Sequence, residues 1–409
     1  TFCERVAAEH PQLWSEWEGY RAAPDAPRSP IDTSDLLVRM APHVSGFIAQ
    51  LFRVEDAVGR LDAQTKELDA LFRFKIDFVR KRALPLVKGG KHVHVEAGDL
   101  SLVQELVRPW AHFDQELAVA HAGNALMDRE TLANASGTAE DEKAALAAQT
   151  DALKRWCAAH LHDPAYRSWV VFKFPETVDY NNLVQVQRPR TDLPEAMLGP
   201  DERLRRRDGF TLTDARGTTR ENLSEIHYCV ICHEREKDSC SKGLRDKEGK
   251  VTANPLGIPL NGCPLDEKIS EMHVVRKHGD AIGALAIVAI DNPMCPGTGH
   301  RICNDCMKGC IYQKQEPVNI PQAETGVLTD VLNMPWGVEI YQLLTRWNPL
   351  NVRRPYALPY NGRNVLVVGL GPAGYTLTHY LLNEGFGAVA DRKSTRLNSS
   401  HGYISYAVF

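Results

Sequence analysis

The sequence lacks long apolar runs, an excess of either charge, and cysteine outside one short region. No apolar stretch approaches the roughly 18 residues that a membrane-spanning helix needs, so we expect no membrane span. The net charge of −4 gives no basic surface of the kind that binds nucleic acid, so no nucleic-acid partner is expected. Hydrophobic residues make up 43% and charged residues 24% of the 409 residues, which is ordinary for a soluble globular protein of two or three domains.

Cysteine is nearly absent outside residues 229–310. Only Cys3 and Cys157 lie elsewhere, and a chain of this size with ten cysteines has too few for a disulfide scaffold. The other eight include two Cys-x2-Cys pairs, a spacing that indicates metal binding in a reducing compartment, and we predict a cytoplasmic protein. The eight are Cys229, Cys232, Cys240, Cys263, Cys295, Cys303, Cys306 and Cys310.

Eight thiols match two [4Fe–4S] clusters, because each cluster takes four cysteine thiolates. The turn of a Cys-x2-Cys pair can also donate backbone N–H groups to the sulfurs. In two-cluster ferredoxins the last cysteine of a tight run often binds the other cluster. By that logic Cys310 joins the first three cysteines of the region, and the remaining four form the second set.

Zinc is the alternative to iron, since four thiolates also make a structural zinc site. The two Cys-x2-Cys pairs lie about 70 residues apart, far beyond zinc-ribbon spacing. The dense run from Cys303 to Cys310 also suits a cubane cluster better. Three histidines, His227, His233 and His300, are close in sequence, but eight cysteines leave no vacancy for them.

A glycine motif, Gly369-x-Gly371-x-x-Gly374, follows the apolar residues 365–368. A helix-compatible run, residues 375–384, comes next, and a second strand is expected from Ala388. This context is typical of a dinucleotide-binding fold, in which the first glycine permits the turn, the second admits the pyrophosphate and the third allows close helix–strand packing. Thr378 stands where such a helix often has a small residue. The motif alone does not separate FAD from NAD(P).

The fold is expected to be mainly α. We predict a helical domain over residues 1–220, a two-cluster ferredoxin-like domain over 221–322, a connector over 323–362 and a truncated Rossmann-type βαβ unit over 363–390. Residues 391–409 match the in-frame translation of a common sequencing adapter, and we expect them not to be natural. Asp391 is therefore not counted as a ribose-binding acid.

Local patterns predict several elements within these regions. Thr33, Ser34 and Asp35 are candidate caps of a helix, residues 169–174 suggest a short strand, and residues 272–291 are helix-like. The first of these helices has one apolar face, formed by Leu36, Leu37, Met40, Val44, Phe47, Ile48 and Leu51.

Four segments together resemble one group of FAD-dependent pyridine-nucleotide oxidoreductases, which includes the small subunit of glutamate synthase and the N-terminal half of dihydropyrimidine dehydrogenase. The segments are Gly262-Cys263-Pro264-Leu265, the Cys303–Cys310 run, Pro317-Val318-Asn319-Ile320 and Val367-Val368-Gly369-Leu370-Gly371-Pro372-Ala373-Gly374. The resemblance implies an α-helical ferredoxin domain with two [4Fe–4S] clusters, held by the eight cysteines named above. It also implies an FAD domain whose pyrophosphate lies at Gly369, Gly371, Pro372, Ala373 and Gly374.

The expected function is electron transfer between a flavin and two [4Fe–4S] clusters, in an oxidoreductase that uses FAD and NAD(P)H and passes electrons to a redox partner domain or subunit. Alone, the chain is expected to bind clusters but neither to hold FAD stably nor to turn over. Two alternatives stay open: a zinc-stabilised helical binding module without redox activity, and an NAD(P) dehydrogenase with a structural metal domain.

Overall fold

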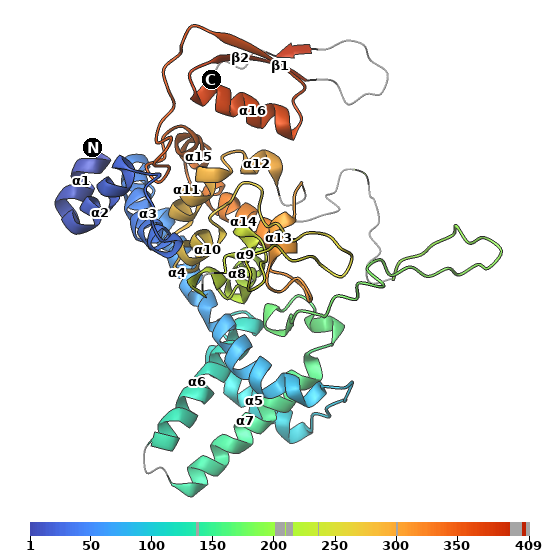
Figure 1. The fold of residues 1–409 in the computed structure, drawn as a ribbon. Helices are drawn as coiled ribbons and strands as arrows, with labels where there is room; N and C mark the ends of the chain where they lie inside the picture. Colours follow the sequence, from blue (N-terminus) through green and yellow to red (C-terminus); the bar gives the residue numbers. More distant parts are fainter. Residues whose placement is uncertain are drawn as a thin grey trace. The chain divides into compact units, whose positions relative to one another are not determined.

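The computed structural model describes residues 1–135, 139–200, 209, 216–235, 237–299, 302–392 and 403–405. The chain is mainly α-helical, as predicted (Figure 1). It divides into two compact units, one made of residues 1–59 and 176–409 and the other of residues 60–175. This division differs from the single helical domain expected over 1–220, because the N-terminal helices pack with the cysteine region.

Three helices open the first unit: α1 (Phe2–Glu9), α2 (Pro11–Ala22) and α3 (Pro30–Phe52). The predicted apolar face of α3 is confirmed for residues such as Leu36, Met40 and Val44, which are fully buried, but not for Leu51 at its end, which is exposed. The helix begins before the expected caps, with Ser29 as N-cap and Pro30 in its first turn, because proline is well suited to the first helical position. Its buried face packs against two helices of the cysteine region, α10 (Ile269–Lys277) and α11 (Ala281–Asp291).

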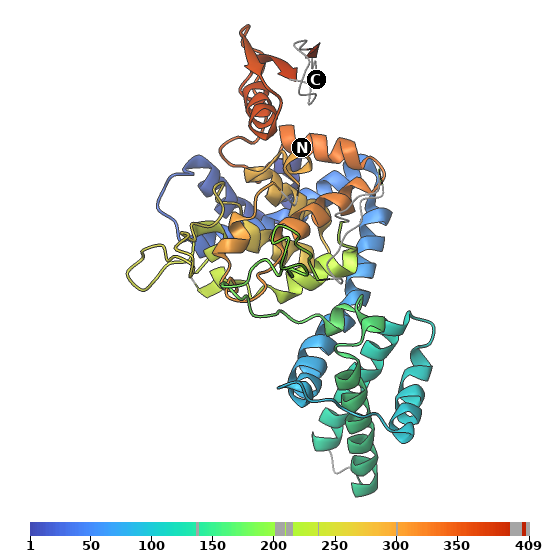
Figure 2. The same cartoon turned by 90° about the vertical axis from the view of Figure 1, so that its right-hand side faces the viewer.

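The second unit is a helical bundle. Its main elements are the C-terminal part of α4 (Glu55–Arg73), the π-helical segment η1 (Phe74–Ala83), α5 (Ala97–Val107), α6 (Gln115–Ala135) and α7 (Glu140–His160). Helices α6 and α7 lie side by side in both ribbon views (Figures 1 and 2). Short 3-10 turns complete the unit: η2 (Leu84–Val87), η3 (Arg108–Trp110), η4 (Pro164–Tyr166) and η5 (Val170–Phe172). The strand expected over 169–174 is wrong, since this segment forms η5.

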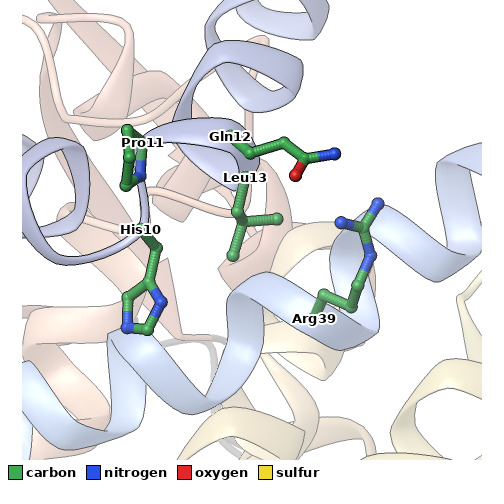
Figure 3. A pocket seen from close by; sticks show the side chains of 5 residues that line it. All are labelled: His10, Pro11, Gln12, Leu13 and Arg39. Carbon is green, nitrogen blue, oxygen red and sulfur yellow. The ribbon is translucent and has the colours of Figure 1, made fainter.

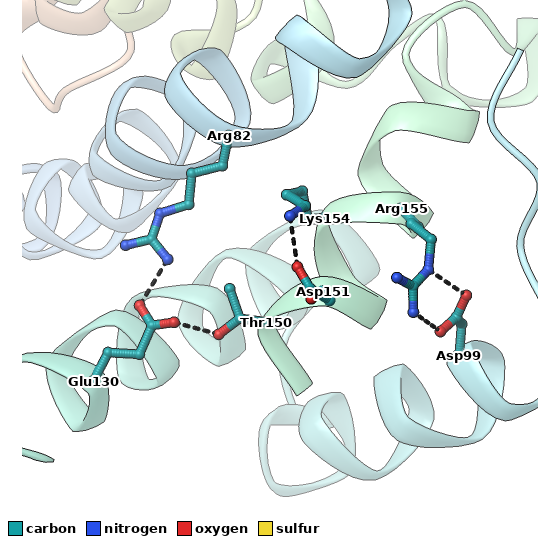
Figure 4. Close-up of polar contacts among 7 residues, drawn as sticks. All are labelled: Arg82, Asp99, Glu130, Thr150, Asp151, Lys154 and Arg155. Atoms are coloured by element: carbon teal, nitrogen blue, oxygen red, sulfur yellow. Dashed lines mark hydrogen bonds and ion pairs between the residues drawn. The ribbon is translucent and has the colours of Figure 1, made fainter. Parts of the chain in front are cut away.

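Ion pairs connect the helices of this bundle (Figure 4). Arg155 on α7 contacts both carboxylate oxygens of Asp99 on α5, at 2.5 and 2.8 Å. Arg82 donates to Glu130 on α6 at 2.6 Å, and Thr150 on α7 donates to the same carboxylate. These five polar side chains therefore bind one another and have a structural role.

Short helices carry four of the eight cysteines and end at two others, while Cys263 and Cys303 lie in the loops between them. These helices are α8 (Thr219–Tyr228), the 3-10 turn η7 (Cys232–Arg235), α9 (Ser239–Lys242), α12 (Cys295–Thr298) and α13 (Asp305–Gly309). The helix expected over 272–291 is two helices, α10 and α11, which are separated at Gly279 with φ +93°. The expected connector is also largely helical and contains most of α14 (Ile320–Leu332) and all of α15 (Gly337–Arg346).

The C-terminal part is a β–α–β unit. Strand β1 (Asn364–Val368) pairs in parallel with β2 (Gly387–Arg392), and α16 (Pro372–Asn383) connects them (Figure 1). Both strands and the helix lie where the sequence predicted them. Strand β2 continues into the segment expected to be adapter-derived, where β3 (Tyr403–Ser405) pairs with it in antiparallel fashion.

Candidate functional site

The first Cys-x2-Cys turn follows directly from the end of α8. Thr218 and Glu221 form a capping box at the start of that helix, and Cys229 is its C-cap. Ile231 adopts φ +46°, a left-handed conformation that is strained for a β-branched residue. Its backbone N–H lies 3.4 Å from Cys229 Sγ and donates to it. The predicted hydrogen bond from the turn to a sulfur is thus present.

Four cysteines line one cavity: Cys229, Cys232, Cys240 and Cys310. These are the four that the sequence placed together. The other lining residues are mainly apolar, among them Ile269, Val318 and Ile320. Burial chiefly, together with the neighbouring Cys310 and Cys232, raises the pKa of Cys229 to about 12. Negative thiolates gathered in such a medium need a cationic partner, so this group suits a metal centre.

Two tyrosines border this first cysteine group. Tyr228 and Tyr312 stack with ring centroids 4.6 Å apart and planes 9° apart, and both pack against the buried cluster that contains Cys240 and Cys310. Gln315 donates to the Tyr228 hydroxyl at 2.6 Å, and that hydroxyl donates to the Glu316 carbonyl at 3.0 Å. The stacked pair adds apolar surface to the surroundings of the first group.

The other four predicted cysteines, called the second group, are Cys263, Cys295, Cys303 and Cys306. Burial chiefly raises the pKa of the Cys306 thiol, and Cys263 and Cys303 are near enough to raise it as well. Cys295 is related to Cys306 by two shared neighbours, since Glu267 and Glu324 raise the pKa of both thiols. Cys303 is exposed, and its thiol contacts Asp305 at 3.5 Å. The structure therefore gathers four of the predicted cysteines around one cavity and brings Cys263 and Cys303 near Cys306, while the eight-thiol arrangement stays a prediction.

Sequence reasoning missed the carboxyl groups beside this second group. Glu324 on α14 is buried, and Asn292 donates to its Oε1 at 2.7 Å. Burial raises the pKa of Glu324 well above its usual range and that of Glu267 to about 7; Glu267 also raises the pKa of Glu324, and Asp291 raises that of Glu267. No local pattern marked these carboxyl groups, because α14 also carries polar residues such as Gln322, Thr325 and Asp330.

The described residues contain no group of three or more His, Cys, Asp or Glu side chains close enough together to hold one metal ion. A single zinc ion needs its thiolates at about 2.3 Å, whereas the thiolates of a cubane cluster attach to different irons. His233 hydrogen-bonds Ser34 Oγ at 2.9 Å, on the first unit's own α3. His300 lies outside the described residues.

The glycine motif forms the expected turn between β1 and α16. Gly369 has φ +99°, which favours glycine, and a Cβ at Gly374 would lie 1.7 Å from the Gly369 carbonyl oxygen. A Cβ at Gly371 would meet no atom within 4 Å, so that side of the turn is open. No side chain caps the N-terminus of α16. Thr378 is accommodated because its hydroxyl donates to the Gly374 carbonyl at 2.8 Å.

Helix α16 contacts the segment that carries Cys295. A Cβ at Gly297 would lie 2.8 Å from the Tyr375 ring, and the Tyr380 hydroxyl donates to the Asp291 carbonyl at 3.4 Å. The glycine turn and the second cysteine group are thus joined through one packed helix.

A hollow on the N-terminal helices is a poorer candidate site (Figure 3). His10, Pro11, Gln12, Leu13 and Arg39 line it. The one cation among them, Arg39, is paired with Glu16 at 2.6 Å and with Asp35 at 2.7 Å. Its charge is therefore already compensated, and the cysteine region is the stronger candidate. Among the described helices, none is both long enough and apolar enough to cross a bilayer.

Comparisons with known proteins connect the chain to two sets of relatives. Residues 1–53 match the family described as the RP005 N-terminal alpha-helical domain. The chain is 57% identical over 97 residues to the uncharacterized protein RP006 of Rickettsia prowazekii, covering 24% of this chain and 14% of that protein. It is 26% identical over 266 residues to the uncharacterized protein RP005 of the same organism, covering 60% of this chain and 81% of that protein.

A further similarity is to an oxidoreductase subunit. The chain is 26% identical over 155 residues to the glutamate synthase [NADPH] small chain of Mycobacterium tuberculosis, which covers 37% of this chain and 28% of that protein. The chain thus spans little more than a quarter of that relative's length. No solved structure matches the chain.

Proposed function

We propose that residues 221–322 hold two [4Fe–4S] clusters and pass electrons between a flavin and a redox partner, as part of an oxidoreductase that uses FAD and NAD(P)H. The observation that carries this proposal is the gathering of four thiols, those of Cys229, Cys232, Cys240 and Cys310, around one cavity. These cysteines come from segments far apart in the sequence, such as Cys229 and Cys310. The partial similarity to a glutamate synthase small chain supports the same class of protein.

The donor sets fit such clusters. Each group offers four thiols, the full complement of one cubane. When bound, the clusters supply one-electron storage and transfer. The chain's own residues hold them, keep water from the first group through Ile269, Val318 and the tyrosine stack, and donate the Ile231 N–H to Cys229 Sγ.

The glycine turn is proposed to receive the FAD pyrophosphate. Gly371 leaves its side of the turn open, and the backbone N–H groups at the start of α16 have no side-chain cap. The positive end of a helix dipole favours a phosphate there. In this proposal Gly369, Gly371, Pro372, Ala373 and Gly374 hold the nucleotide, and α16 places it near the second cysteine group.

The test is metal analysis of the whole chain purified without oxygen. Residues 1–59 must be kept, because α3 packs against α10 and α11. We expect about eight irons and eight acid-labile sulfides per chain, together with electron paramagnetic resonance (EPR) signals of reduced clusters. Stoichiometric zinc without labile sulfide would overturn the proposal and favour the zinc-stabilised helical module.

A further inference from the structure

The two cysteine groups are joined by a short stretch of closely packed backbone. The Cys263 N–H donates to the Cys240 carbonyl at 2.8 Å, so one hydrogen bond links a member of each group. Helix α13 also connects them, since Cys306 of the second group and Cys310 of the first lie at its two ends.

Two glycines allow this close approach. A Cβ at Gly309 would lie 2.7 Å from the Ser239 carbonyl oxygen and 2.9 Å from Gly262 Cα. A Cβ at Gly262 would lie 2.5 Å from the Gly243 nitrogen and 2.7 Å from the Ser241 carbonyl oxygen. All of these neighbours are backbone atoms, which cannot rotate away as a side chain can. A methyl group at either position must therefore push α13 or the Cys263 segment away from α9.

The positions of the two glycines decide what such a shift would move. Gly309 directly precedes Cys310, and Gly262 directly precedes Cys263. Displacing Gly309 moves a thiol of the first group, and displacing Gly262 moves a thiol of the second. We infer that Gly262 and Gly309 are positioning residues that set the separation of the two cysteine groups, and with it the electronic coupling of the clusters they hold. This inference rests on the proposed function.

Electronic coupling between two centres falls steeply with their separation, so a small displacement has a measurable effect. In the reduced wild-type chain, two paramagnetic clusters this close should interact and broaden each other's EPR signals. Gly309→Ala and Gly262→Ala should keep the iron and sulfide content of the wild type but lose that broadening.

Two matched controls separate contact from general glycine effects. Gly257 has φ +76° on the loop between Cys240 and Cys263, and Gly98 lies in α5; a Cβ at either would meet nothing within 4 Å. Gly257→Ala reproduces the backbone strain of Gly262→Ala without its contacts. Gly98→Ala is the control for Gly309→Ala, since both glycines lie within helices. Both control variants should leave the EPR broadening unchanged.

The iron and sulfide content of the wild type is measured first, because it separates the proposed function from this inference. A wild type without about eight irons and sulfides would reject the proposed function, and this inference with it. With a loaded wild type, three results would overturn the inference alone: non-interacting signals in the wild type, unchanged broadening in both variants, or loss of iron from both variants. The last result would show that the glycines are needed for assembly rather than for spacing.

Discussion

The first cysteine group lies among apolar side chains and two stacked tyrosines, whereas the second lies beside two buried carboxyl groups and leaves Cys303 exposed. Net charge near a cluster and its exposure to solvent are two of the factors that set its reduction potential. Two sites built from the same four-thiol set therefore offer different environments. The surroundings, more than the cysteines, would therefore distinguish the two centres.

The largest expected effect is the loss of one complete site. Cys310→Ala should lower the iron and labile-sulfide content to about half, because the first group would lose a thiol that comes from the far end of the region. Metal analysis and the helical circular dichroism signal would be measured together. The control is Cys157→Ala, a buried cysteine of the second unit, which should keep the full content; an unchanged content in Cys310→Ala would contradict the grouping.

A similar loss is expected from the second group. Glu324 lies close enough to Cys295 to raise the pKa of its thiol, and both side chains are buried, so either could be the fourth ligand. We expect Cys295→Ala to remove about half of the iron and Glu324→Gln to retain it, since thiolate is the usual ligand of these clusters. The reverse pattern would show that the carboxylate, and not Cys295, completes the second site.

A smaller effect concerns how readily each site gives up iron. Because Cys303 is exposed and Cys229, Cys232, Cys240 and Cys310 are not, a chelator or oxygen should attack the second site several-fold faster. The single-site variants Cys310→Ala and Cys295→Ala allow each rate to be followed by loss of visible absorbance. Equal rates would mean that exposure does not distinguish the two sites.

The smallest expected effect is a pH dependence of the scaffold next to the first group. His273 on α10 is fully buried, its ring nitrogens have no hydrogen-bond partner among the described residues, and burial lowers its pKa to about 4 from an ordinary 6.5. Between these values the unfolded chain binds a proton that the folded chain does not. The free energy of unfolding contributed by this group should therefore fall as pH drops below 6.5, by about 1 kcal/mol at one pH unit lower.

Denaturant unfolding of His273→Leu and wild type across this pH range measures that contribution. In His273→Leu, the free energy of unfolding should fall less steeply as the pH drops, because this contribution is missing. His278→Leu is a suitable control, because His278 lies at the exposed end of the same helix and its ring Nδ1–H donates to the Val274 carbonyl at 2.8 Å. A slope that is the same in His273→Leu and the wild type would contradict the assignment.

The sequence by itself determined the elements whose signals are local. The apolar face of α3, strand β1 with its glycine turn and helix α16, and the number and spacing of the cysteines could all be predicted, because each depends on residues that are neighbours in the chain. The boundaries were less predictable. Helix α3 begins at Pro30 rather than after the expected caps, and Gly279 divides one expected helix into α10 and α11.

Contacts between residues that are distant in the sequence became visible only in the tertiary structure. The packing of α3 against α10 and α11, the placing of Glu267 and Glu324 beside Cys295, and the backbone contact of Gly309 with Gly262 all join residues distant in sequence. The sequence did predict that Cys229, Cys232, Cys240 and Cys310 lie together, as they do around one cavity, yet the carboxyl groups near Cys295 had no local signal. Such contacts depend on burial and close packing summed over several helices, which no short stretch of sequence contains.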